Sequence, residues 1–177
     1  MSDGKDTQWQ IRAATGADIG TLALVGAATF LETFADILNG DAIVKHCETQ
    51  HSKSAYDAYL RDGATAWLGE LTDGQAPVSY ALLCKPDLAA AADDGSDIEL
   101  KRIYSLSRFH GSGMGPALLD KAVNAASKTA RRLLLGVYNG NERAIAFYEK
   151  QGFEQVATRQ FQVGDNLYDD IVFAKTL

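Results

Sequence analysis

The sequence predicts a single α/β domain built on a mixed, largely antiparallel sheet with helices on its faces. Residues 64–84 form two strand-like segments joined at Asp73-Gly74, the composition of a tight hairpin turn. A strand beginning at Ile98 then passes through a glycine-dense loop directly into a helix. Strand and helix patterns alternate after that point. Hairpins followed by strand–helix–strand units give a mixed sheet.

The N-terminal third predicts one short strand and three helices. Apolar and polar residues alternate over 9–13, and apolar residues recur at helical spacing over 19–34, 41–47 and 52–60. Thr15 is a candidate cap for the first helix and Asp41 for the second. His46 and His51 stand five residues apart, which is not the spacing of a helical metal pair, and we expect both to face solvent.

The remaining elements follow the same patterns. A partner strand ends before Pro86, and the stretch 87–97 is expected to be an exposed loop. The continuous apolar run 133–138 suits a strand that is buried on both faces. A helix is expected over 141–150, and closing strands over 153–163 and 168–174, joined by a turn at 164–166.

Length and charge limit the classes of function. The 177 residues predict one domain spanning 1–177, and a net charge of −6 argues against a nucleic-acid binder. No apolar run approaches the length of a membrane span, and the N-terminus has no apolar core of a signal peptide. Cys47 and Cys84 are far apart and are expected to be reduced, which favours a cytoplasmic protein that binds no metal.

The stretch from Ile98 to Gly115 carries the first chemical signal. Its glycines allow a tight turn and a close approach of backbone to ligand, and the N–H groups at a helix start attract anions. A phosphate-bearing ligand is therefore expected, although a purely structural turn would use the same residues. A P-loop would need Gly-Lys-Ser/Thr, and a dinucleotide fingerprint would need a third glycine where Pro116 stands.

This loop resembles the acetyl-CoA-binding loop of the GNAT acyltransferase superfamily, whose pattern is Gln/Arg-x-x-Gly-x-Gly/Ala. The sequence departs from that pattern at His110, since a neutral imidazole is not a fixed positive charge. The segment from Asn141 to Phe153 closely resembles a second GNAT motif, N-x-x-A-x-x-F/L-Y-x-K-x-G-F. Both motifs stand in the order and on the elements that the family uses.

The resemblance implies the GNAT fold, with about seven strands whose central members splay apart to admit the CoA arm. It implies a cofactor site for acetyl-CoA at Ile103, Tyr104, Ser105, His110, Gly111, Ser112, Gly113, Met114, Gly115, Pro116, Asn141, Ala144 and Tyr148. Tyr148 would be the general acid, because a phenol stays protonated at neutral pH. Glu99 would be the general base acting through water, or alternatively only a solvated charge at a strand edge.

The implied activity is acetyl transfer to a primary amine, of a polyamine, another small molecule or a peptide, by direct attack in a ternary complex. Phe30, Phe34 and Tyr138 are the candidate residues of the acceptor pocket. The strand 135–138 and the segment 161–165 look most like the polyamine-acetylating branch. The alternative is a GNAT-fold module that binds CoA without turnover. Exposed edge strands make a homodimer plausible.

Overall fold

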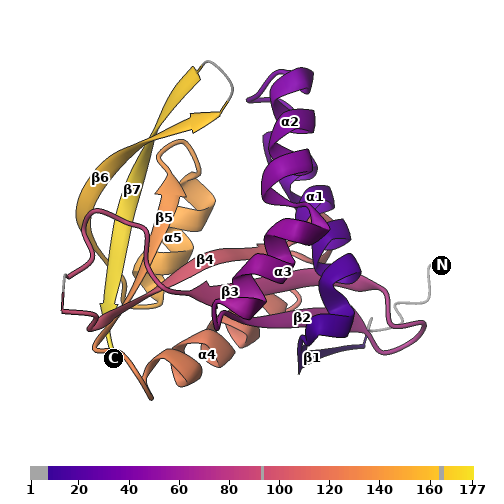
Figure 1. Ribbon diagram of the computed structural model, residues 1–177, viewed down its shortest axis with the longest axis horizontal. Helices are drawn as coiled ribbons and strands as arrows, with labels where there is room; N and C mark the ends of the chain where they lie inside the picture. Colours follow the sequence, from indigo (N-terminus) through magenta and orange to yellow (C-terminus); the bar gives the residue numbers. More distant parts are fainter. Residues whose placement is uncertain (1–7, 93, 164–165) are drawn as a thin grey trace.

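The computed structural model describes residues 8–92, 94–163 and 166–177, so most of the turn predicted at 164–166 lies outside the described residues. Seven described strands form one sheet in the order β1-β2-β3-β4-β5-β7-β6, in which only β4 and β5 run parallel (Figure 1). The strands are β1 (Trp9–Ala13), β2 (Thr65–Leu71), β3 (Pro77–Cys84), β4 (Asp97–Ser105), β5 (Arg132–Tyr138), β6 (Glu154–Val163) and β7 (Asn166–Thr176). The predicted fold class is confirmed.

Helices cover both faces of this sheet. They are α1 (Ile19–Phe34), α2 (Gly40–Gln50), α3 (Lys53–Arg61), α4 (Met114–Ala126) and α5 (Glu142–Lys150). Leu22 and Val25 of α1 and Tyr56 of α3 pack on one face, where they meet Leu68 of β2. The α4 and α5 helices pack on the other face. The sheet therefore separates two hydrophobic cores.

Short polar side chains fix where the N-terminal helices begin. Thr15 and Asp18 form a capping box around the short turn (Gly16–Asp18) that leads into α1. The N-cap of α2 is Asn39, whose side chain accepts the N–H of Ala42 at 2.8 Å. The prediction of Asp41 as that cap was wrong, because the chain enters the helix two residues earlier.

The β4 and β5 strands pair only at their beginnings and then separate. Their register covers three residue pairs, Asp97 with Arg132, Ile98 with Leu133 and Glu99 with Leu134. Beyond these pairs β4 stays with β3 and β5 stays with β7, and the two strands visibly diverge (Figure 1). The sheet is therefore open at its centre, in agreement with the splayed strands that the resemblance implied.

A β-bulge on β4 changes which side chains share a face. Leu82 pairs with Arg102 and Leu83 pairs with Leu100, so Lys101 is an extra residue on β4. A bulge allows two neighbouring side chains to point to the same side of a sheet. Lys101 and Arg102 indeed both line one cleft.

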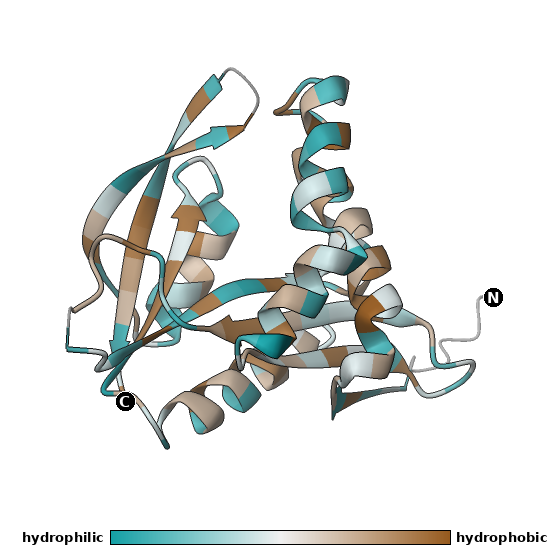
Figure 2. Cartoon of the chain, viewed as in Figure 1, coloured by the Kyte–Doolittle hydropathy of each residue, from teal (hydrophilic) through white to brown (hydrophobic). Residues whose placement is uncertain are grey.

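The helical stretch Gly16–Phe34 is long and apolar enough, by length and composition, to cross a membrane. The expectation that no segment approaches such a span therefore needs correction. A single helix of this kind is weak evidence, because core helices of other proteins pass the same test. Apolar residues also run through the central strands and this helix in Figure 2. Here Leu22 and Val25 are buried against the sheet.

Candidate functional site

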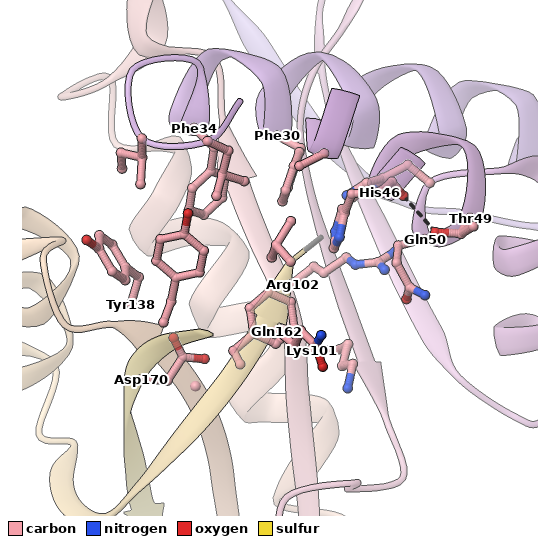
Figure 3. A pocket seen from close by; sticks show the side chains of 18 of the residues that line it. Phe30, Phe34, His46, Thr49, Gln50, Lys101, Arg102, Tyr138, Gln162 and Asp170 are labelled. Atoms are coloured by element: carbon pink, nitrogen blue, oxygen red, sulfur yellow. Dashed lines mark hydrogen bonds between the residues drawn. The ribbon is translucent and has the colours of Figure 1, made fainter. Parts of the chain in front are cut away.

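A cleft of about 540 Å³ lies between the α1–α2 region and the open side of the sheet (Figure 3). Its walls come from α1, α2, β4, β5, β6 and β7, elements distant in the sequence. The lining includes Phe30, Phe34, Lys45, His46, His51, Tyr59, Asp87, Lys101, Arg102, Tyr104, Gly136, Tyr138, Arg159, Phe161, Tyr168 and Asp170. This volume suits a small molecule. Three of these residues, Phe30, Phe34 and Tyr138, are the predicted acceptor-pocket residues.

Aromatic rings form one wall of the cleft. The ring of Phe30 lies 4.6 Å from that of Phe34 and stacks on that of His46 at 4.0 Å, between centroids. On the facing wall Tyr138 of β5 meets Tyr168 of β7 edge to face at 5.9 Å. Such a pair of walls presents flat apolar faces to a ligand.

The two histidines predicted to face solvent instead belong to this wall. His51 is only 4% exposed, and its Nδ1 lies 3.0 Å from the Tyr56 hydroxyl. Burial lowers the pKa of His46 to about 4 and that of His51 to about 3, and the charge of Arg102 acts in the same direction. Both imidazoles are therefore neutral at pH 7. The prediction was wrong because helical spacing alone did not show that α2 packs against α1.

The floor of the cleft carries cations from β4. Arg102 is 8% exposed, and its guanidinium lies over the rings of Tyr56 and Tyr59, at 5.2 and 5.4 Å from their centroids. Its Nη1 has no hydrogen-bond partner. Lys101 lies beside it and pairs with Asp87 at 2.5 Å. Sequence reasoning missed these residues as candidates, because strict strand alternation places them on opposite faces.

Glu99, the predicted general base, lies below this floor and does not line the cleft. It is 2% exposed, accepts the backbone N–H of Asp87 at 2.9 Å and lies 3.4 Å from Lys101 Nζ. Burial raises the pKa of Glu99, although Lys101 opposes the shift. The alternative reading as a solvated edge charge was wrong.

A second buried carboxylate, Asp170 of β7, does line the cleft. It is 6% exposed, and its Oδ2 accepts a hydrogen bond from Arg159 Nε at 3.1 Å. Burial raises the pKa of Asp170, while Arg159 opposes the rise. It pairs in register with Tyr138 across β5 and β7. This carboxylate of the cleft was thus absent from the sequence-based candidates.

Tyr104 marks where the cleft meets the opening between β4 and β5. It lies beyond the last residue of β4 that pairs with β5, and it lines the cleft. Its charge would raise the pKa of Tyr148, which burial already raises well above the ordinary value. Tyr148, from α5 on the opposite face, is 7% exposed and packs edge to face on Phe147 and Phe153. Tyr104 thus lines the cleft on one side of the sheet, and Tyr148 packs in the core on the other side.

The glycine loop lies at the far end of β4. Gly111 and Gly113 have φ values of 82° and 86°, the left-handed region that favours glycine. Gly113 is the N-cap of α4, so its helix begins at Met114. Gly115 has an ordinary helical conformation, and an added Cβ would meet no atom within 4 Å. No packing requirement thus explains Gly115, whereas a closely approaching ligand would.

His110 holds the loop together and positions a cation. Its Nε2 lies 3.0 Å from the carbonyl oxygen of Ser105, and its Nδ1 contacts the Arg143 guanidinium. The carbonyl can only accept and the guanidinium can only donate, so these contacts suit the tautomer with hydrogen on Nε2. The fixed positive charge that the family pattern can place at this position is supplied here by Arg143, beside His110. Arg143 was not singled out from the sequence, although it stands inside the second motif.

Other predicted site residues also have structural contacts. The side-chain oxygen of Asn141 accepts the N–H of Ala144 at 3.1 Å and so caps α5. The Ser105 hydroxyl lies 2.6 Å from that of Ser79, which also donates to the Tyr104 carbonyl. Trp9 of β1 donates to the Ser112 carbonyl at 3.2 Å. Ile103 packs on the α4 side of the sheet, and Pro116 lies in the first turn of α4.

Within the described residues no group of three or more His, Cys, Asp or Glu side chains could hold a metal ion. Cys47 and Cys84 are free thiols, both half-buried. Burial raises the pKa of Cys84 to about 12, so that thiol is a poor nucleophile at neutral pH.

Comparisons with known proteins converge on one family. The model of the acetyltransferase (GNAT) family matches residues 31–153. An uncharacterized N-acetyltransferase of Mycobacterium tuberculosis is 34% identical over 161 residues, which are 90% of this chain and 98% of the relative. One from Lactobacillus delbrueckii is 24% identical over 90% of this chain and 92% of its own length.

Solved structures share the fold. The PaiA N-acetyltransferase of Thermoplasma acidophilum, solved in complex with coenzyme A, superposes with a TM-score of 0.75 at 19% identity, over 96% of this chain and 99% of that one. The ribosomal-protein-alanine N-acetyltransferase of Brucella melitensis gives a TM-score of 0.70 at 27% identity, over 95% and 99% of the two chains. An acetyltransferase of Salmonella typhimurium with acetyl-CoA gives 0.68 at 17%, over 96% and 94%.

Proposed function

Because this chain belongs to the acetyltransferase (GNAT) family, we propose that it transfers the acetyl group of acetyl-CoA to a primary amine bound in the cleft. The observation that carries this proposal is the opening between β4 and β5. The glycine loop follows the end of β4, Tyr104 of β4 lines the cleft beyond the last β4–β5 pair, and Tyr148 lies on α5 at the other face of the sheet. We further propose that the whole chain forms one catalytic domain, as the coverage of its relatives favours.

The loop and its surroundings fit the phosphates of CoA. Gly111 and Gly115 leave open space where side chains would stand. The backbone N–H groups at the start of α4 are suited to bind an anion. Arg143, held by His110, supplies a cation at the same place. The backbone of Ile103, Tyr104 and Ser105 borders the sheet opening, where it would pair with the pantetheine arm. Solved relatives with coenzyme A or acetyl-CoA support this assignment.

The reaction requires one bond to form and one to break. The lone pair of a neutral amine attacks the thioester carbonyl, the carbon–sulfur bond breaks, and the ammonium proton leaves to a base. A backbone N–H near Tyr104 would stabilise the negative charge that develops on the carbonyl oxygen. Tyr148 would protonate the departing thiolate, a role that suits its raised pKa because the phenol stays protonated.

Two carboxylates compete as the base that accepts the amine proton. Glu99 is the candidate from the sequence, but it is sealed below Lys101 and would need a water or Lys101 to relay the proton. Asp170 is in the cleft itself, and burial raises its pKa above the ordinary value. Direct access favours Asp170. Loss of turnover in Glu99→Gln but not in Asp170→Asn would return the role to Glu99.

The acceptor is a small-molecule amine or the amine of a peptide. The sequence resemblance to polyamine-acetylating enzymes makes a polyamine one candidate. The two sheet edges, β1 and β6, are the surfaces through which the predicted homodimer would form.

The test is acetyl-CoA-dependent thiol release, with product mass, against a panel of amino acids, short peptides, polyamines and other amines. We expect one amine class to gain an acetyl group. Tyr148→Phe should lower kcat at least about tenfold, with little change in CoA affinity. Arg143→Gln should raise the KM for acetyl-CoA and leave kcat unchanged, the opposite pattern. CoA binding without turnover of any amine would instead favour the non-catalytic module.

A further inference from the structure

The charges of the cleft limit which amines can be the acceptor, an inference that rests on the proposed function. We propose that the acceptor is a small amine that also carries a carboxylate, as an α-amino acid does, and that Arg102 binds this carboxylate.

Arg102 is a buried cation without a counter-ion. Within the described residues no carboxylate lies within ion-pair distance of its guanidinium, and Nη1 has no hydrogen-bond partner. Its guanidinium lies over the phenol rings of Tyr56 and Tyr59, and Figure 3 shows it extending toward His46. An unpaired buried charge is strongly destabilising. Arg102 lines the cleft, and a planar guanidinium with an unsatisfied donor is suited to a ligand carboxylate, which it binds through two parallel hydrogen bonds.

The neighbouring carboxylates are already paired with protein cations. Asp87 pairs with Lys101 at 2.5 Å, and Asp170 pairs with Arg159 at 3.1 Å. Glu99 is below the floor and also faces Lys101. A polyamine with several ammonium groups would therefore have to displace protein cations to find a counter-ion. This arrangement disfavours polyamines.

The balance of formal charge in the cleft is positive. Its lining holds four cations (Lys45, Lys101, Arg102 and Arg159) against two carboxylates (Asp87 and Asp170), a difference of +2. The whole protein, by contrast, has a net charge of −6. Cations near the bound amine also lower its pKa, so that more of it is the neutral nucleophile. The cleft thus attracts an anionic group and deprotonates an ammonium group with the same residues.

The remaining walls fit a compact apolar body. Phe30, Phe34 and Tyr138 offer ring faces, and the cleft volume of about 540 Å³ must also hold the acetyl end of the donor. A free amino acid with an aliphatic or aromatic side chain fits these dimensions. The carboxylate would lie on Arg102 and the side chain between the rings.

The test compares amines that differ only in the carboxylate. The probes are L-phenylalanine and 2-phenylethylamine, L-tyrosine and tyramine, L-leucine and isopentylamine, with spermidine as the polycationic amine. We expect kcat/KM for at least one amino acid to exceed that of its decarboxylated partner by at least about tenfold. That ratio corresponds to the free energy of one hydrogen bond to a charged group. Equal or higher activity with the decarboxylated amines, or a preference for spermidine, overturns the inference and leaves the proposed function intact.

Variants assign the effect to Arg102. Arg102→Met should abolish the preference for the carboxylate, and Arg102→Lys should retain part of it, because it keeps the charge and loses the fork. Arg61→Met is the matched control, since Arg61 is 80% exposed on α3 and outside the cleft. It should keep the full preference. An unchanged preference in a folded Arg102→Met, by its melting temperature, would contradict the role.

A binding measurement separates this inference from catalysis. 3-Phenylpropionate has the carboxylate but no amine, and it should bind the wild-type protein in calorimetry at least about tenfold more tightly than it binds Arg102→Met. Equal binding to both proteins counts against Arg102. If no amine is acetylated but 3-phenylpropionate binding depends on Arg102, the carboxylate site stands and the proposed function fails.

Discussion

At the scale of single residues, the neutral histidine His51 links the cleft to stability. It is buried between α1 and α3, where it contacts Tyr56, His46 and the charge of Arg102. Its pKa is lowered from 6.5 to about 3, so below pH 6.5 the unfolded chain binds a proton that the folded chain does not. Its contribution to the free energy of unfolding is therefore fully present above pH 6.5 and is lost as the pH falls.

We expect His51→Gln to reduce the loss of stability between pH 7 and pH 5. The slope attributable to His51 is about 1.4 kcal/mol for each pH unit below 6.5. Urea unfolding at several pH values measures the free energy of unfolding of both proteins. The contributions of Glu99 and Asp170, which oppose that of His51, are common to both proteins and cancel in the difference. The variant will be less stable overall, because the Tyr56 hydroxyl loses its partner. Parallel curves for the two proteins would show that His51 is protonated in the folded state.

Residue types predicted the glycine loop better than the charged residues of the cleft. His110, Gly111 and Gly115 stand in a motif that places them on one loop. Arg102 and Asp170 have no such local pattern. Their proximity depends on the β-bulge at Lys101 and on how β7 pairs with β5, and both are long-range features of the sheet. The roles assigned to these residues stay predictions.

At the scale of elements, two glycines lie at the first turn of α4 for opposite reasons: Gly115 is in that turn, and Gly69 of β2 lies against it. A Cβ on Gly115 would meet no atom within 4 Å, whereas a Cβ on Gly69 of β2 would lie 2.7 Å from Met114 Sδ and 3.0 Å from Ser79 Cβ. Met114 is fully buried, so its side chain has little freedom to move. The first glycine leaves space for a ligand, and the second lets the helix approach the sheet.

We therefore expect opposite outcomes for two alanine substitutions. Gly115→Ala should keep or raise stability, by up to about 1 kcal/mol from helix propensity, while raising the KM for acetyl-CoA. Gly69→Ala should lower stability by about 1–3 kcal/mol through overpacking. Gly20→Ala in α1, where the new Cβ makes only an ordinary contact with Lys53, is the matched helical control and should leave KM unchanged. Thermal melting and acetyl-CoA titration measure both effects. A normal KM in Gly115→Ala would refute the proposed role of the open space.

Elements themselves were well predicted. The glycine loop, the hairpin at Asp73-Gly74 and the helix that begins after Asn141 all form where turn residues and hydrophobic periodicity indicated. Boundaries differ by one or two residues, as for Asn39 at the start of α2. Local signals of this kind set where an element begins and ends. They do not show how α2 packs on α1, and for that reason the positions of His46 and His51 were wrong.

At the scale of the whole molecule, the open sheet lies between the cleft and the proposed donor site. In the proposed function the glycine loop and α5 bind the donor, while α1, α2 and the β6–β7 pair contribute to the lining of the cleft. Figure 1 shows where these elements lie around the sheet. Tyr104, half-buried at the opening, belongs to both. Such an arrangement allows donor and acceptor to be bound together. The two half-buried thiols are free, and burial raises the pKa of both, which argues against an acetylated cysteine intermediate.

The most direct test of this account is an initial-rate study in which acetyl-CoA and the preferred amine are varied together. Direct transfer in a ternary complex predicts intersecting double-reciprocal lines, and no acetylated protein when acetyl-CoA is added without an amine. Parallel lines, together with an acetyl group found on the protein by mass spectrometry, would contradict it. They would mean that the open sheet delivers the acetyl group to a protein side chain before the amine arrives.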